Sequence, residues 1–179
     1  MSPTFWLLQD LQNKLQDGFI KYPFKTEKDG ELCVTPSVYI GHVPLKEADK
    51  DNGNVPYIII KSLSGVIKST EKGQRIYEVK IAFFCHTYNN DCFSEIEAGY
   101  NDILNMVERV LIILNDNHFY ADDNWKYIEP VIWTTGAEKE TGLYEQGTQK
   151  HPFYGAVVEA TFNTQAIERL RFSKLMGEE

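Results

Sequence analysis

SEIEAGYNDILNMVERVLIILNDN, residues 94–117, is the stretch of sequence that decides the fold class. Its first four residues form a capping-box pattern, in which the Ser94 hydroxyl accepts a hydrogen bond from the Glu97 amide and the Glu97 carboxylate reaches back. Apolar residues then recur at helical spacing: Ile96, Tyr100, Ile103, Val107, Val110, Leu111 and Leu114. A stripe this wide is typical of a helix that lies flat on a sheet, so the sequence predicts one long central helix over residues 94–117.

Two strands are predicted just before this helix. In residues 75–85, apolar and polar side chains alternate, which is the period of a strand with one buried face. The apolar set is Tyr77, Val79, Ile81, Phe83 and Cys85. Residues 55–63 are a second β-rich run, and the connection between the runs contains Gly65 and Gly73. We therefore expect a long antiparallel hairpin whose tip, between residues 66 and 73, can project beyond the core.

A second helix is predicted at the N-terminus, over residues 3–17. Ser2 is a candidate N-cap, and Pro3 suits the first helical position because its missing amide hydrogen costs nothing there. The core-facing stripe is Leu8, Leu11, Leu15 and Phe19. Gly18 is expected to end the helix in the left-handed conformation, and residues 21–30 are predicted to be loop or turn.

Three further β-rich segments complete the expected sheet. Residues 32–40 contain Pro36 and residues 127–133 contain Pro130, so each is predicted to be an edge strand or a strand with a bulge. Residues 153–162 are predicted to form the last strand.

The predicted fold class is α+β, with a mixed or antiparallel sheet packed by the central helix and the N-terminal helix. A length of 179 residues fits one domain over residues 1–179. Two polar segments are predicted to be flexible loops, residues 44–54 and 134–151. The tail, residues 167–179, is expected to be a short helix or frayed.

The composition excludes several classes of function. The formal net charge is −8, from 26 acidic and 18 basic residues, and binding to a nucleic-acid backbone requires a clustered basic surface instead. No nucleic-acid recognition is therefore predicted. The three cysteines, Cys33, Cys85 and Cys92, are an odd and sparse set, which favours free thiols in a reducing compartment.

Membrane insertion and secretion are also not expected. The longest wholly apolar run is residues 110–114, whereas a spanning helix needs about 20 residues. The first residues reach Asp10 without a basic region or an unbroken apolar core, so no signal peptide is predicted.

The reactive side chains do not form a recognisable catalytic pattern. Cys85, His86 and Cys92 are the densest group, but structural zinc sites take paired ligands from two turns and this chain offers no second pair. Cys92 could meet a histidine in space, although nothing near it in sequence would lower the thiol pKa. The Asp122-Asp123-Asn124 run is more simply a turn, and the sequence has no phosphate loop, HExxH or GxSxG motif. No catalytic, cofactor-binding or metal-binding residue is predicted, and no enzyme activity.

The order of the predicted helices and strands, and their residue patterns, nevertheless resemble one family. The segments in question are the N-terminal helix, Pro56-Tyr57-Ile58-Ile59-Ile60, the strand 77–83, Gly99-Tyr100-Asn101-Asp102-Ile103 and His151-Pro152-Phe153-Tyr154-Gly155. Together they look like a tail terminator protein of long-tailed bacteriophages or of a prophage. The similarity spans most of the chain and includes no invariant chemical motif.

This resemblance implies a structural role in virion assembly. Proteins of this family end polymerisation of the tail tube and form the tail side of the head–tail junction. The resemblance implies a homo-oligomeric ring, typically a hexamer, that contacts the tail tube protein and the head connector or completion protein. It also implies assembly in the bacterial host cytoplasm and a final location in the tail or neck of the virion. Candidate contact regions are residues 66–73, 44–54 and 134–151.

Two alternatives remain open at the level of sequence. Another neck, tail-completion or tube protein would have the same order and pattern of helices and strands, because these proteins share related sheet-plus-helix folds. A small cytosolic enzyme or ligand-binding domain is the alternative from a different class. An exposed sheet edge and a ring would favour assembly, whereas a deep pocket with convergent titratable groups would favour the enzyme.

Overall fold

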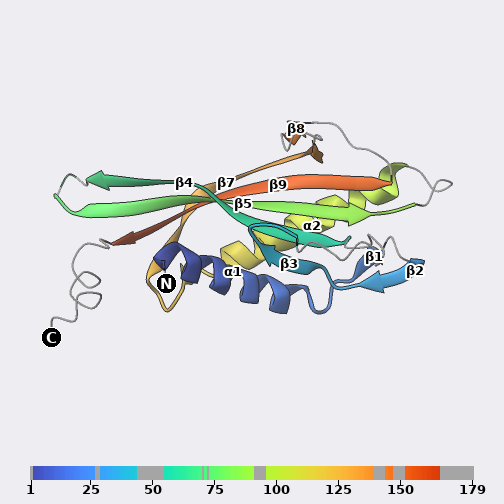
Figure 1. The fold of residues 1–179 in the computed structure, drawn as a ribbon, viewed down its shortest axis with the longest axis horizontal. Helices are drawn as coiled ribbons and strands as arrows, with labels where there is room; N and C mark the ends of the chain where they lie inside the picture. The colour runs from blue at the N-terminus through green and yellow to red at the C-terminus, as the bar shows by residue number, and fades with distance from the viewer. Residues whose placement is uncertain are drawn as a thin grey trace.

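Two helices pack against one face of a curled, mixed sheet, and the predicted α+β class is confirmed (Figure 1). The computed structural model describes residues 2–26, 29–43, 55–69, 71, 73–90, 96–138, 144–146 and 152–165. The expected loop 44–54, the tail 167–179 and much of the expected loop 134–151 lie outside these residues.

The main sheet has six strands in the order β3-β4-β5-β9-β7-β6. Their bounds are β3 Ser37–Ile40, β4 Tyr57–Ser69, β5 Arg75–Tyr88, β9 Phe153–Gln165, β7 Trp125–Glu138 and β6 Phe119–Tyr120. The β3–β4 pair is parallel and the other neighbours are antiparallel. β8 (Tyr144–Gln146) pairs with the end of β7, and β1 (Phe24–Thr26) pairs with β2 (Asp29–Val34) in a separate small sheet.

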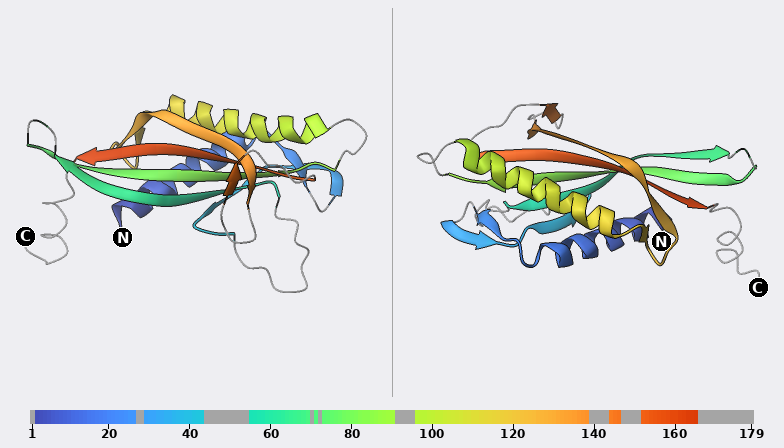
Figure 2. Two further views of the ribbon diagram at one scale, coloured as in Figure 1. Left: turned by 90° about the horizontal axis from the view of Figure 1, so that it is seen from above. Right: turned by 180° about the vertical axis from the view of Figure 1, so that it is seen from behind.

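Helices α1 (Pro3–Phe19) and α2 (Ile96–Asp116) cover the same face of the sheet. α2 lies along β5 and β9, and α1 lies beside β3 and β4 (Figure 2). Within the described residues, no helix is long and apolar enough to cross a membrane. The predicted Ser94 capping interaction lies outside the described residues, and the Ser2 side chain makes no capping hydrogen bond.

The core lies between the helices and the sheet, on the predicted faces. Both helical stripes are largely buried, and alternate residues of β5 from Val79 to Cys85 point into the same core. Among the described stripe residues of α2, Tyr100 is 39% exposed and Leu111 is partly buried. The largest fully buried side chains include Trp125, Tyr120, Phe19, Phe83 and Phe162.

Two glycines lie where the helices approach other elements closely. The prediction for Gly18 is wrong: α1 continues through it to Phe19, and a Cβ at Gly18 would lie 2.4 Å from Ile113 Cδ1 on α2. Gly18 is therefore a close-contact residue of the helix pair. A Cβ at Gly99 would lie 2.1 Å from the Tyr154 ring, so α2 sits against β9 at a position that has room for glycine alone.

The two strand prolines act as predicted, whereas two predicted loops are partly wrong. Pro36 falls in the break between β2 and the edge strand β3, and Pro130 lies in a register shift of β7 between Ile128 and Ile132. The predicted loop 21–30 contains β1 and the start of β2. The predicted loop 134–151 contains the end of β7 and all of β8. These short strands form by pairing with each other or with β7, and such pairing leaves no local pattern in sequence.

Candidate functional site

The β4–β5 hairpin extends beyond both helices (Figures 1 and 2). Pairing runs from Tyr57 opposite His86 to Ser69 opposite Arg75, which confirms the predicted antiparallel hairpin. All side chains of β4 from residue 62 onward are exposed. We call residues 61–80 the arm. Its outward apolar side chains are Leu63, Val66 and Ile67, which are 47%, 46% and 60% exposed.

The arm has a free edge along β4. β3 pairs with β4 only as far as Ile60, where the Gly41 amide donates to the Ile60 carbonyl at 2.9 Å. Beyond that point no strand among the described residues pairs with this side of β4. The backbone carbonyl of Ile60 faces β3, and the register shift between Ser62 and Ser64 moves the alternation by one residue. Beyond this shift, the backbone N–H and C=O of Gly65 and Ile67 face the free side. A free edge of this kind is able to accept another chain.

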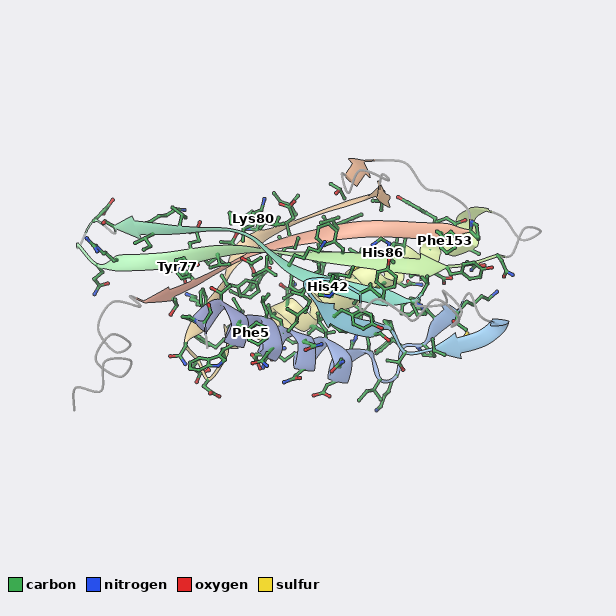
Figure 3. All side chains as sticks on the ribbon, viewed as in Figure 1. Phe5, His42, Tyr77, Lys80, His86 and Phe153 are labelled. Atoms are coloured by element: carbon green, nitrogen blue, oxygen red, sulfur yellow. The ribbon has the colours of Figure 1, made fainter. Side chains whose placement is uncertain are left out.

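Contacts within the arm, and from the arm to β7 and β9, brace it. Tyr77 lies over Gly65, where a Cβ would come within 2.7 Å of the Tyr77 hydroxyl, and its ring meets Trp125 edge-on at 5.7 Å between centroids. Lys68 forms an ion pair with Glu78 at 2.7 Å, and Lys80 forms one with Glu159 of β9. Figure 3 shows Tyr77 and Lys80 on the arm side of His86 along β5. The arm therefore presents its apolar side chains on a braced ribbon.

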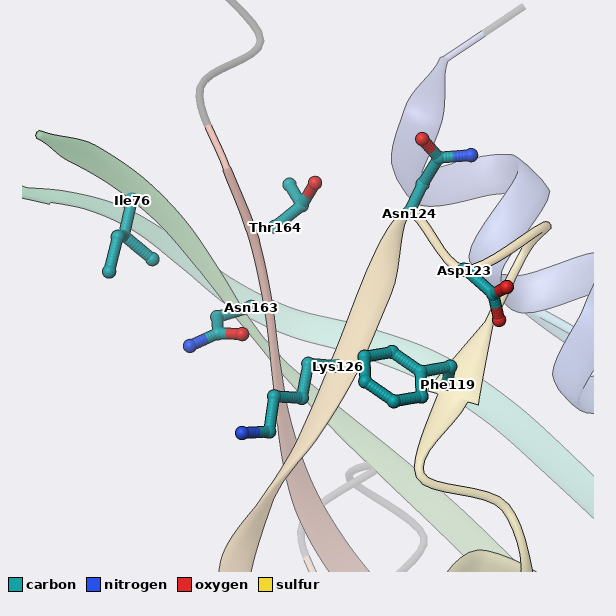
Figure 4. Close-up of a pocket in the computed structure, with 7 residues that line it drawn as sticks. All are labelled: Ile76, Phe119, Asp123, Asn124, Lys126, Asn163 and Thr164. Atoms are coloured by element: carbon teal, nitrogen blue, oxygen red, sulfur yellow. The ribbon is translucent and has the colours of Figure 1, made fainter.

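An open groove lies beside β6, where β5 and β7 begin and β9 ends, so Ile76 of the arm forms part of its wall. Two adjoining hollows, of about 440 and 570 Å³, share Phe119, Lys126 and Asn163 in their linings. Figure 4 shows the first hollow, with Phe119, Asp123 and Asn124 on one side and Ile76 across β9. Farther along β7, Ile132 and Trp133 are 57% and 43% exposed. Because its walls come from four separate segments, no sequence motif could have indicated this groove.

Among the described residues, no cysteine and histidine candidates are brought together. Cys85 points into the core, and burial raises the pKa of its thiol to about 12. His86, the next residue of the strand, points to the opposite face and stacks on Tyr57 at 4.6 Å between ring centroids. Burial and the nearby Lys61 ammonium lower the pKa of His86 to about 4. Cys92 and His151 lie outside the described residues.

The other chemical candidates have structural explanations. Residues 121–123 form a turn with φ of 50°, 54° and 62°, as predicted for the acidic run. The Asp10 carboxylate of α1 accepts a hydrogen bond from the Ala121 amide at 2.9 Å and so ties this turn to the helix, a role that the sequence did not suggest. Within the described part of the chain, no three His, Cys, Asp or Glu side chains gather closely enough to hold a metal ion.

Comparison with known proteins adds no relative. No protein-family model matches this chain, and no curated protein matches it.

Proposed function

We propose that this protein is a structural assembly protein of a long-tailed bacteriophage or prophage, and that it ends tail-tube polymerisation as a tail terminator. It forms a ring of identical copies, a hexamer by the family resemblance, on the end of the tube. The opposite side of the ring faces the head connector or completion protein. The observation that carries this proposal is the arm, a braced hairpin with exposed apolar side chains and a free edge.

Ring formation needs two different surfaces on each copy. A cyclic assembly with more than two members uses heterologous contacts, in which one patch of a copy meets another patch of its neighbour. The arm supplies one such surface, because Val66 and Ile67 are solvent-exposed in the single chain. Exposed apolar side chains gathered on one element are typical of a protein–protein contact.

The geometry of the described residues favours assembly over catalysis. The groove is wide and shallow, and its lining contains Asp123, Lys126 and Glu129 without a buried nucleophile beside them. The two groups with strongly shifted pKa values near each other in sequence, Cys85 and His86, point to opposite faces of β5. Enzyme sites instead gather shifted groups in one pocket.

Tail-tube growth in vitro tests the proposal. Tube protein from the same phage or prophage is polymerised with and without this protein, and tube lengths and tube ends are examined by negative-stain electron microscopy. We expect short tubes of uniform length with added density at one end. Density along the whole tube would identify a tube subunit instead. Unchanged tubes with bare ends would contradict the proposal.

A matched pair of variants ties the result to the arm. Val66→Glu places a charge on the arm, and Ile112→Glu places the same charge on the exposed face of α2, where the isoleucine is 46% exposed, as Val66 is. We expect Val66→Glu to lose tube capping and Ile112→Glu to keep it. Equal capping by both variants would remove the arm from the contact.

A further inference from the structure

We infer that the arm of one copy seats against the β6–β7 side of the next copy, head to tail. This inference rests on the proposed function and specifies the contact that would build the ring. The occupant of the groove is a second copy of this chain. The part that enters it is the projecting end of the arm, which exposes Val66 on the face of the sheet away from the helices and Ile67 on the opposite face.

Charge distribution supports this pairing. The arm, residues 61–80, contains five basic and two acidic residues and has a net charge of +3, although the whole chain has −8. Residues 116–138, which include β6 and β7, contain five acidic residues and one basic residue, a net charge of −4. Opposite potentials attract across an interface and set which surfaces meet. A symmetric arm-to-arm contact would place +3 against +3 and is disfavoured.

Apolar side chains match on the two surfaces. On the β6–β7 side, Phe119 and Ile132 are 50% and 57% exposed on the face of the sheet away from the helices, which is also the face of Val66 in the arm. Trp133 is 43% exposed on the opposite face. The adjoining hollows beside Phe119 and Lys126 leave room for inserted side chains. Apolar residues surrounded by complementary charge are the usual composition of a specific interface.

Ile76, near the outer end of the arm, lines the first hollow, so the arm borders the groove of its own copy across β9. In the strand order, β4 lies near one edge of the sheet and β6 and β7 lie at the other, with β5 and β9 between them. The arm also points away from the body (Figure 1). The free edge of β4 and the β6–β7 side therefore lie toward opposite edges of the sheet, and each can meet a different copy. Such a head-to-tail repeat forms a ring when the rotation between copies closes.

Mixing two variants, each with one introduced surface cysteine, tests the pairing. In a full-length Cys33→Ser, Cys92→Ser background, Ile67→Cys marks the arm and Ile132→Cys marks the β6–β7 side, while the buried Cys85 is left in place. A short bismaleimide is added to each variant alone and to an equal mixture, and products are separated on a denaturing gel. We expect about tenfold more covalent dimer in the mixture than in either variant alone, because binding raises the effective concentration of the two thiols.

An exposed isoleucine of α2 supplies the control. Ile112→Cys replaces Ile132→Cys in a second mixture and should give no more dimer than the separate variants. Strong cross-linking of Ile67→Cys with itself would indicate arm-to-arm contact and overturn the inference. Equal yields in both mixtures, or no dimer in either, would also overturn it. Tube capping by the wild-type protein is measured in a separate experiment. If the wild type caps tubes but the mixture gives no extra cross-linked dimer, the proposed function stands and this contact between copies is rejected.

Discussion

The body and the arm are built from the same two strands, yet they differ in what supports them. In the body, Ile81 of β5 is fully buried beneath the helices, whereas Ile67 of β4 in the arm is 60% exposed. Both residues follow the alternation of the same hairpin. The same face of the hairpin is therefore buried in the body, where it stabilises the fold, and exposed in the arm, where it is free to bind.

The energetic consequence follows from burial. Removing an apolar side chain from a filled core costs its transfer free energy and leaves a cavity, whereas removing one already in water costs little. Stability should therefore depend on the body, and association should depend on the arm.

The largest expected difference comes from a matched pair of isoleucines. Ile81→Ala leaves a cavity between β5 and the helices, and we expect the free energy of unfolding to fall by about 3 kcal/mol. Ile67→Ala should lower it by less than about 0.5 kcal/mol. Chemical denaturation of both variants measures the two values. Similar losses would show that the arm is part of the core.

Two glycines give the next comparison. In the body, Gly99→Ala would place a methyl group 2.1 Å from the Tyr154 ring, and we expect a loss of about 2 kcal/mol despite the better helix propensity of alanine. In the arm, Gly65→Ala meets the end of the Tyr77 side chain, 2.7 Å away at its hydroxyl. That ring is able to swing outward, so a loss of under about 1 kcal/mol is expected. Thermal unfolding measures both losses of stability. A smaller loss for Gly99→Ala than for Gly65→Ala would contradict the close packing of α2 on β9.

Protonation provides a smaller effect, confined to the body. The pKa of His86 is about 4 in the folded protein, below its ordinary 6.5. As pH falls, this imidazole is therefore protonated in the unfolded chain before it is protonated in the folded protein. Stability is therefore unaffected above about pH 6.5 and declines from there toward pH 4. We expect a loss of about 1.5 kcal/mol between pH 7 and pH 4.5, allowing for partial solvent screening.

His86→Phe is the control for this pH dependence, because phenylalanine keeps the ring that stacks on Tyr57 and removes the proton. Urea denaturation of the variant across the same pH range should show a smaller decline than the wild type. An unchanged decline would assign the effect to carboxylates elsewhere in the chain.

The smallest expected effect on stability accompanies the largest effect on association. Val66→Glu in the arm should change the free energy of unfolding by no more than about 0.5 kcal/mol, since its side chain is solvent-exposed. The same change should prevent association by placing a carboxylate against the acidic β6–β7 side. Circular dichroism and sedimentation velocity measure the two quantities. A variant that associates normally would contradict the assignment of the arm.

The elements with strong local patterns were predictable from sequence. The stripe of the central helix and the alternation of residues 75–85 each carry their own period, so α2 and β5 appear within a few residues of the predicted bounds. The projection of the hairpin was also expected, because its connection carries turn residues and few core positions. Physical signals contained within one segment were sufficient for these features.

Features that depend on contact between distant segments were not predictable. Gly18 looked like a helix terminator, and only the approach of Ile113 on α2 shows that the helix needs a small residue there. The groove combines Ile76, Phe119, Lys126 and Asn163 from different strands. The charge difference between the arm and the β6–β7 side was present in the sequence, but it became meaningful once the strand order placed them apart. The terminator role itself stays a prediction.

Light scattering over a concentration series, with the protein alone and with purified tail tubes, tests the central claim most directly. If the chain assembles through its arm, the mass should rise from 20.6 kDa to a closed species of about six times that value, alone or on tube ends. A 20.6 kDa monomer at every concentration that also ignores the tubes would contradict the account.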